Sequence, residues 1–252
     1  SDVYKRQVLP MPLNRRSLLT RALGASVTAI PVLAAQPRVA RAAGPSLAPA
    51  LALIMNSGEA SVSVIDMTTR KVVHDLPTLR EPSHWALSPD RSKLYIADAS
   101  GNALFIVDPV TGAALGHKTI ADPYQLGYTP DQRYLVINAL RLDYVDVYRA
   151  SDLGLVKRFS PGSMPSHLDF SPDSRWSFSS MQGSNTLVSF DLNDMAIRWK
   201  SKVGRTPAGV LWHKGKVFVC IMGESHVAQL YPVTGAVIRR IETGVGPHNI
   251  FL

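Results

Sequence analysis

Cysteine is almost absent from this chain. The 252 residues include one, Cys220, so no internal disulfide can form. Its neighbours in VFVCIM are apolar, whereas a reactive thiol needs an electropositive, partly exposed setting. We therefore predict that Cys220 is a buried packing residue. Several motifs of common sites are also missing: C-x-x-C-H for covalent haem, H-E-x-x-H for zinc, the P-loop and G-x-S-x-G.

Long apolar runs are missing as well. The most apolar stretch, residues 22–35, has 14 residues and contains a proline, which is too short to span a bilayer. It follows Arg15-Arg16 and precedes Ala40 and Ala42, which stand at the A-x-A spacing of a cleavage site. Because two leucines follow soon after the paired arginines, the segment resembles a twin-arginine (Tat) signal. An ordinary secretory signal is the alternative.

The sequence therefore predicts a bacterial protein exported to the periplasm. We assign residues 11–42 to the signal peptide, with cleavage near Ala42, and we expect no transmembrane segment in the mature chain. Residues 1–10 precede Met11, the only sensible start, and we interpret them as a non-native or read-through leader.

Excess charge is small once this leader is set aside. The formal net charge is +8, from 27 Lys and Arg against 19 Asp and Glu. Residues 1–42 hold seven of the basic residues and one of the acidic ones, which leaves 20 and 18, a net of +2. Nucleic acids are bound through clusters of basic side chains, so we do not expect a nucleic-acid partner.

What the chain does contain is a repeat. The spacings between the prolines that precede successive apolar runs are 41, 42, 42 and 40 residues. Ser/Thr-Pro-Asp turns recur with the same period. Each unit reads as four short strands, such as HWALS, KLYIAD, ALFIVD and LGHKTI, with turn residues between them. Four strands every 40–45 residues are typical of a β-propeller blade, so we predict an all-β propeller. The prolines are Pro82, Pro123, Pro165, Pro207 and Pro247.

The segments NSGEASVSVIDMTTRKVV, LYIADASGNALFIVDPVTGAAL and VGPHNI resemble the YVTN-type repeat of YncE-like exported propellers. The pattern is also similar to the d1-haem propeller of cytochrome cd1 nitrite reductases. This resemblance implies seven blades, whereas we count five here, so we expect a truncated chain. The alternative is a five-bladed ring in which HNIFL completes the first blade. We assign residues 43–252 to the propeller, with repeats near 51–81, 82–122, 123–164, 165–206 and 207–252.

Propellers bind ligands around the central channel, where the loops that enter the innermost strands converge. Arginine suits carboxylate or phosphate, and neutral histidine suits a metal or haem iron. Each histidine could instead bond nearby backbone at the start of its strand, and histidines in separate blades do not by themselves define a metal site. The predicted ligand-binding residues at the channel mouth are Arg80, His84, Gln125, His167, Arg205, His248 and Asn249.

Two further sets of residues have structural predictions. We expect the four tryptophans to pack between blades and the histidines on outer-strand patterns to be exposed. The first set is Trp85, Trp176, Trp199 and Trp212, and the second is His74, His117 and His226.

These observations favour a non-catalytic scaffold that binds a small ligand or a periplasmic protein. The alternative is a propeller that binds d1-type haem or a related cofactor and is linked to a redox enzyme. A propeller lactonase ranks third, because such enzymes need channel carboxylates and the aligned positions carry His, Gln, Gly and Asn. No catalytic residue and no metal ligand is assigned.

Overall fold

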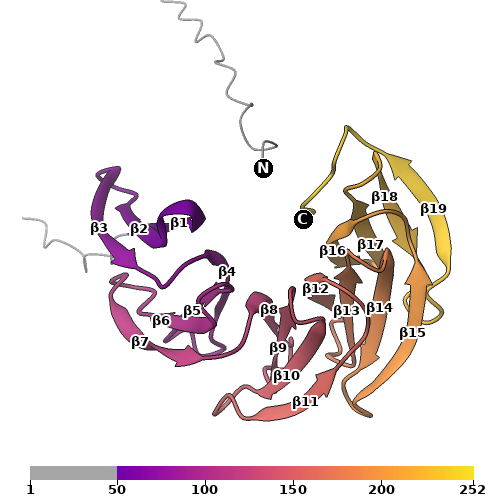
Figure 1. Ribbon diagram of the computed structural model, residues 1–252, viewed down its shortest axis with the longest axis horizontal. Coiled ribbons are helices and arrows are strands. Elements are labelled where there is room, and N and C mark those ends of the chain that lie inside the picture. Colours follow the sequence, from indigo (N-terminus) through magenta and orange to yellow (C-terminus); the bar gives the residue numbers. More distant parts are fainter. Residues whose placement is uncertain (1–49) are drawn as a thin grey trace, which may run out of the picture. The chain divides into compact units, whose positions relative to one another are not determined.

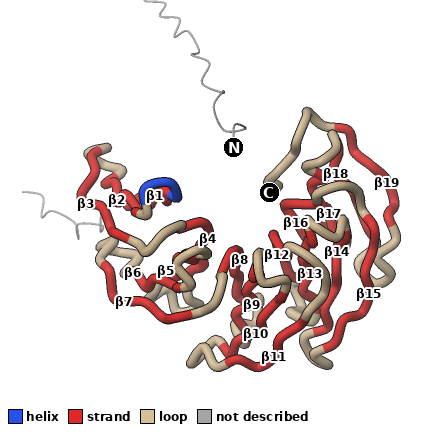
Figure 2. Tube along the Cα trace, in the orientation of Figure 1, coloured by secondary structure: helices blue, strands red, loops and turns tan. Residues whose placement is uncertain are grey.

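The computed structural model describes residues 50–252, which belong to one compact unit. These residues form four four-stranded antiparallel sheets and one three-stranded sheet, which follow one another in chain order (Figures 1 and 2). The only helical segment among them is the short 3-10 turn η1, Ser57–Glu59. The predicted all-β propeller with five blades is therefore confirmed, with a first blade that has three strands. The proposed leader and signal peptide lie outside the described residues.

The blades share one order of strands. The inner strands are β4 (Pro82–Leu87), β8 (Pro123–Tyr128), β12 (Pro165–Phe170) and β16 (Pro207–His213). The second strands are β1 (Leu51–Asn56), β5 (Leu94–Asp98), β9 (Tyr134–Ala139), β13 (Trp176–Met181) and β17 (Lys216–Ile221). The third strands are β2 (Ser61–Asp66), β6 (Ala103–Val107), β10 (Tyr144–Arg149), β14 (Thr186–Asp191) and β18 (His226–Leu230). The outer strands are β3 (Lys71–Pro77), β7 (Ala114–Thr119), β11 (Leu155–Phe159), β15 (Ala196–Lys202) and β19 (Val237–Glu242).

Burial follows this order because the middle strands are covered on both faces. Every residue of β5 is buried, whereas nearly every residue of β7 in the same blade is exposed. Each inner strand begins with proline, which lacks an N–H and is tolerated at the first residue of a strand. The inner strands pair on one edge only, and they lie on the inner side of the row of blades in Figure 1.

The Ser/Thr-Pro-Asp turns join the inner strand to the second strand. In the second blade, Asp90 accepts hydrogen bonds from the Ser88 hydroxyl at 2.7 Å and from the Ser92 amide at 3.0 Å. These bonds lower the pKa of Asp90 to about 2. Turns in which the Asp side chain bonds to neighbouring residues need Asp and Ser or Thr at fixed positions. The sequence therefore shows these turns directly.

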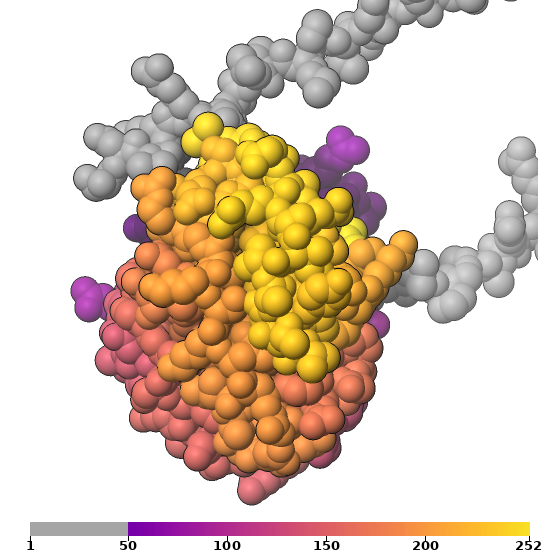
Figure 3. Space-filling view, turned by 90° about the vertical axis from the view of Figure 1, so that its right-hand side faces the viewer, coloured from indigo at the N-terminus to yellow at the C-terminus, as the bar shows by residue number. Residues whose placement is uncertain are grey.

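Aromatic side chains pack the last two blades together. The surfaces of these blades, orange and yellow in Figure 3, adjoin each other. Trp212 of β16 stacks on Phe178 of β13 with ring centres 5.7 Å apart. Trp199 of β15 donates from its indole nitrogen to the Pro232 carbonyl at 2.8 Å. The predicted packing role is confirmed for these tryptophans and for Trp176, which packs against the same cluster. Trp85 is different, because it is 57% exposed.

The close approach of the Trp199 ring requires glycine at position 235. The φ of Gly235 is +72°, and a Cβ at this position would lie 2.6 Å from the Trp199 ring. Gly215 has a similar φ of +70° but no atom within 4 Å of its would-be Cβ. We expect Gly215→Ala to cost about 1 kcal/mol of unfolding free energy for the backbone conformation. Gly235→Ala should cost about 1 to 3 kcal/mol more, because the clash adds overpacking. Urea denaturation of both variants measures the difference, and equal losses would contradict the contact.

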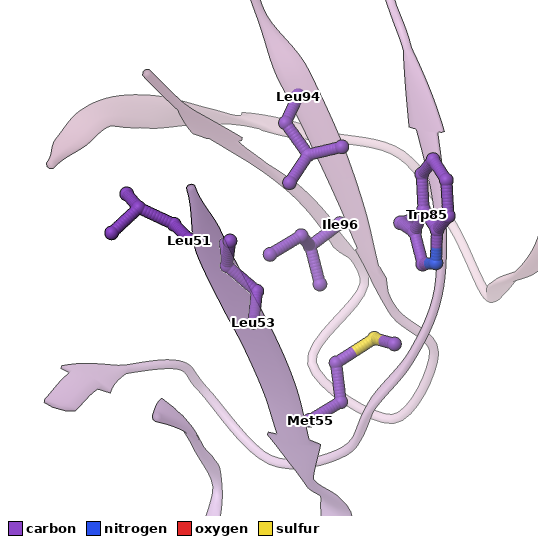
Figure 4. A pocket seen from close by; sticks show the side chains of 6 residues that line it. All are labelled: Leu51, Leu53, Met55, Trp85, Leu94 and Ile96. Carbon is purple, nitrogen blue, oxygen red and sulfur yellow. The ribbon is translucent and has the colours of Figure 1, made fainter. Parts of the chain in front are cut away.

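The first blade lacks an inner strand within residues 50–252. Its strand β1 bonds only to β2. One face of β1 borders an apolar pocket of about 240 Å³, which β4 and β5 also line (Figure 4). Residues 247–252 are not in a strand, and they contact β16 through a 2.8 Å bond from the Gly209 amide to the His248 carbonyl. The pocket is lined by Leu51, Leu53, Met55, Trp85, Leu94 and Ile96.

Two single-residue predictions have opposite outcomes. Cys220 is buried, as predicted, and burial raises the pKa of its thiol to about 11. His226 was expected to be exposed, and this is wrong: it is 4% exposed. The reason is that His226 begins β18, a middle strand that pairs with both β17 and β19. No helix within residues 50–252 is long and apolar enough to cross a membrane.

Candidate functional site

The inner strands of four blades border one cavity at the channel. Its volume is about 430 Å³, within the range of small-molecule sites. Figure 1 shows the inner strands on the concave side of the arc of blades; they are β4, β8, β12 and β16. Residues of β1 and of the C-terminal segment complete the wall. The lining residues are Met55, Ser83, His84, Trp85, Gln125, His167, Leu168, Asp169, Gly209, Val210, Leu211, Asn249, Ile250 and Phe251.

His167 is a buried polar side chain of this cavity. It is 3% exposed, and its Nδ1 shares a 2.7 Å hydrogen bond with the Ser166 hydroxyl. That hydroxyl also accepts a bond from the Gln182 amide at 2.8 Å, and the His167 backbone amide donates to Ser180 Oγ at 3.1 Å. The ring is therefore fixed through Nδ1. The buried Nε2 makes no hydrogen bond of standard geometry, although the Asn249 side chain lies close enough to raise the pKa of His167 against the effect of burial.

His84 lies beside it on β4. The two ring centres are 5.5 Å apart and the ring planes meet at 85°. The ring of Tyr124 packs on the other side of His84 with a centre separation of 4.6 Å. The Nδ1 of His84 is also buried without a hydrogen-bond partner. Since buried polar atoms are nearly always paired, two unpaired imidazole nitrogens on residues that line one cavity mark it as a candidate ligand site.

Both imidazoles are neutral at neutral pH. Burial, together with the neighbouring His248, lowers the pKa of His84 to about 4. Burial, with further contributions from His84 and His248, lowers the pKa of His167 to about 3. A neutral imidazole has one lone pair and one N–H. The pair can therefore bind a metal or share hydrogen bonds, but it cannot hold an anion by charge.

His248 joins these two rings from the C-terminal segment. Its ring centre is 4.8 Å from that of His167, and burial lowers the pKa of His248 as well. The structure thus brings together His84 and His167, which the proline alignment placed at equivalent positions, and His248, which stands one position before the aligned Asn249. Among residues 50–252, no set of three or more His, Cys, Asp or Glu side chains is arranged to hold a metal ion.

Other cavity residues join neighbouring blades. Gln125 accepts a 2.7 Å hydrogen bond through Oε1 from the Leu168 amide, and Asp169 accepts a 2.5 Å bond from the Trp212 amide. Burial raises the pKa of Asp169. Sequence reasoning missed Asp169, although its position two residues after His167 places both side chains on one face of the strand. Asn249 also lines the cavity, as predicted for the channel mouth.

The two predicted arginines do not line the cavity. Arg80 borders a separate surface pocket together with Glu81, Ser100 and Arg141. Arg205 is 73% exposed at its side chain, and its Nε lies 3.9 Å from Glu224. Since no Lys or Arg is among the lining residues of the channel cavity, nothing basic there could pair with a carboxylate or phosphate. The assignment of ligand-binding roles to the seven residues stays a prediction.

A buried carboxylate fixes the loop that leads to His84. Asp98, at the end of β5, accepts hydrogen bonds at 2.8 Å from four backbone amides, and its own exposure is 0%. The loop that enters β4 is therefore bound to the middle of the same blade. The donors are the amides of Leu79, Arg80, Glu81 and Gly101.

Comparison with solved structures supports the same architecture. Hydrazine synthase of Kuenenia stuttgartiensis is 14% identical, with a TM-score of 0.56 over 79% of this chain and 85% of that one. A chain of the Mitotic Checkpoint Complex is 10% identical, with a TM-score of 0.68 over 79% and 64%. A functionally unknown protein from Desulfotomaculum acetoxidans DSM 771 is 15% identical, with a TM-score of 0.62 over 76% and 66%. At these identities the likeness concerns the fold alone.

The sequence itself gives the family. No curated protein matches the chain, but the model of the YNCE-like beta-propeller family matches residues 14–252. This match includes all five described blades and the channel residues that they carry. The chain belongs to the YNCE-like beta-propeller family.

Proposed function

We propose that this chain is an exported, periplasmic propeller scaffold that binds a small ligand in its channel cavity and has no catalytic role of its own. One observation carries the proposal. His84 and His167 come from different blades, yet their ring centres are 5.5 Å apart, both residues line the cavity, and each ring has one buried nitrogen without a hydrogen-bond partner. Leaving such atoms unpaired costs stability, and a bound ligand would remove that cost.

The lining also defines which ligands suit the cavity. Its polar groups are neutral imidazoles, amides and a hydroxyl, with Asp169 as the single carboxylic acid and no Lys or Arg. Trp85, Leu211 and Phe251 supply apolar surface. An uncharged or cationic ligand therefore fits this wall better than a carboxylate or a phosphate does. The twin-arginine-like leader supports export to the periplasm. That route carries proteins across the membrane already folded.

A haem-type cofactor is the second candidate. The unpaired imidazole nitrogens could supply an axial ligand to haem iron. However, haem carries carboxylate side chains, and no basic residue lines the cavity to pair with them. We therefore place this candidate second and derive no step through it.

Native mass spectrometry tests the proposal. The chain is expressed with its own leader, and the exported form is purified without added cofactor. We expect a non-protein mass on the wild type that is lost in His84→Ala and in His167→Ala. His117→Ala is the matched control, because His117 is an exposed histidine on the outer strand β7, and it should keep the bound mass.

The outcomes separate the candidates. A bound mass accompanied by a Soret absorption band would favour haem over the scaffold with another small ligand. The mass of the bare polypeptide in the wild type and in all three variants would contradict a small ligand, and the search would turn to periplasmic protein partners.

A further inference from the structure

Three nitrogen and sulfur donors border the channel cavity from different blades. His84 lies on β4 and His167 on β12. The third donor is the thioether of Met55, which lies on β1 and lines both this cavity and the neighbouring apolar pocket. Figure 4 shows the Met55 side chain extending from β1 toward Trp85 of β4.

We propose that the channel cavity binds a copper ion through the imidazole nitrogens of His84 and His167, with the Met55 thioether as a soft third donor. This inference rests on the proposed function and names its ligand. Cysteine, histidine and carboxylate ligands alone do not form a set of three within residues 50–252, and a thioether donor adds a ligand of a different kind.

The separation of the rings suits one shared ion. Metal–nitrogen bonds to histidine are about 2.0–2.1 Å long, so the centres of two imidazole rings on one ion lie roughly 5 to 6 Å apart. The His84 and His167 ring centres are 5.5 Å apart. The unpaired atoms are Nδ1 of His84 and Nε2 of His167, and both are buried. The separation of the ring centres is therefore compatible with both imidazoles binding one ion, and each ring has one nitrogen without a hydrogen-bond partner.

His167 also has the support that a ligating histidine needs. Histidines that bind metals donate their other N–H to a fixed partner, which sets the tautomer and the ring orientation. For His167 that partner is the Ser166 hydroxyl at 2.7 Å. Gln182 donates to the same hydroxyl at 2.8 Å, so Ser166 is itself held in place. In the tautomer in which Nδ1 of His167 donates to Ser166, Nε2 carries the lone pair that a metal ion needs.

The donor types select copper among common cations. Imidazole and thioether are ligands for copper, whereas Mg²⁺ and Ca²⁺ prefer several oxygen donors. The cavity has one carboxylate, Asp169, and it already accepts two backbone hydrogen bonds. No Lys or Arg lines the cavity to repel a cation. A thioether favours Cu(I) over Zn²⁺, which gives the test its control metal.

The test is a titration of the exported protein with Cu(I) against a colorimetric chelator, after removal of any bound ligand by dialysis. We expect one copper per chain. His84→Ala and His167→Ala should each weaken binding by about 100-fold or more, and Met55→Leu should weaken Cu(I) binding by about 10-fold while leaving Zn²⁺ binding unchanged. His117→Ala is the control and should bind as the wild type does. X-ray absorption of the Cu(I) form should show nitrogen scatterers and one sulfur, with the sulfur lost in Met55→Leu.

Each other outcome overturns the inference. Copper that binds equally well to the wild type and to the histidine variants would lie elsewhere. An organic mass in the native spectrum of the wild type, without copper affinity, would retain the proposed function and overturn copper as the ligand. The absence of both would overturn both. Urea denaturation of His84→Ala and His167→Ala ensures that a loss of affinity is not a loss of fold.

Discussion

The propeller should lose stability steeply between pH 7 and pH 4.5. The pKa of His84 is about 4 and that of His167 about 3 in the folded chain, against about 6.5 when unfolded. Because these folded-state values are depressed, the unfolded chain takes up protons first as the pH falls, which favours unfolding. The loss is on the order of 2 to 3 kcal/mol for each histidine at pH 4.5. Urea midpoints measured across this pH range test the prediction.

The double variant His84→Gln, His167→Gln is the matched comparison, since glutamine does not titrate. Its unfolding free energy should vary far less between pH 7 and pH 4.5 than that of the wild type. Carboxylates act in other windows: the pKa of Asp191 is about 2, so its contribution is lost only below about pH 3.8. Burial raises the pKa of Asp169, which opposes the histidine effect. Equal pH dependence in the variant and the wild type would contradict the neutral, buried histidine pair.

Replacing Asp98 with alanine should cost about 3 to 5 kcal/mol of unfolding free energy. The carboxylate accepts four backbone hydrogen bonds at 2.8 Å from a position with no solvent exposure. Alanine leaves these amides without their acceptor, and unsatisfied buried donors cost about 1 to 3 kcal/mol each before the loop relaxes. Because the loop leads into β4, ligand binding at His84 should weaken as well. Urea denaturation measures the stability.

Asp98→Asn and Asp152→Ala are the two comparisons. Asparagine keeps one acceptor oxygen and should lose less stability than alanine does. Asp152 is an exposed aspartate that accepts bonds from Arg149 and Gly154, so its replacement by alanine should cost about 1 kcal/mol or less. If Asp98→Ala were no more costly than Asp152→Ala, the carboxylate would not hold the loop.

The fold could be predicted from sequence because the features of each blade depend on residues that are close together in the chain. These features are the short strands, the Asp90-type turns and the proline that begins each inner strand. Alternation alone does not show whether a strand is in the middle or at the rim of a sheet. His226 illustrates this, because its polar setting resembles an outer strand while β18 is covered on both edges.

The site was predictable only in part, for a related reason. Alignment on the prolines placed His84 and His167 at equivalent positions and put His248 one position before the equivalent Asn249. Equivalent residues of different blades converge on the channel. The same alignment grouped Arg80 with Arg205, but these precede the strand and lie in loops. Their side chains are not part of the cavity wall. Which nitrogens stay unpaired depends on side-chain contacts between strands. The bond between the adjacent residues Ser166 and His167 depends on their rotamers. No sequence pattern displays either.

A crystal structure of the exported protein, purified without added ligand, would show directly whether the channel cavity is a ligand site held by His84 and His167. We expect non-protein density within contact distance of both His84 Nδ1 and His167 Nε2. A cavity that contains only water, or one that is filled by protein side chains which satisfy both nitrogens, would contradict this expectation.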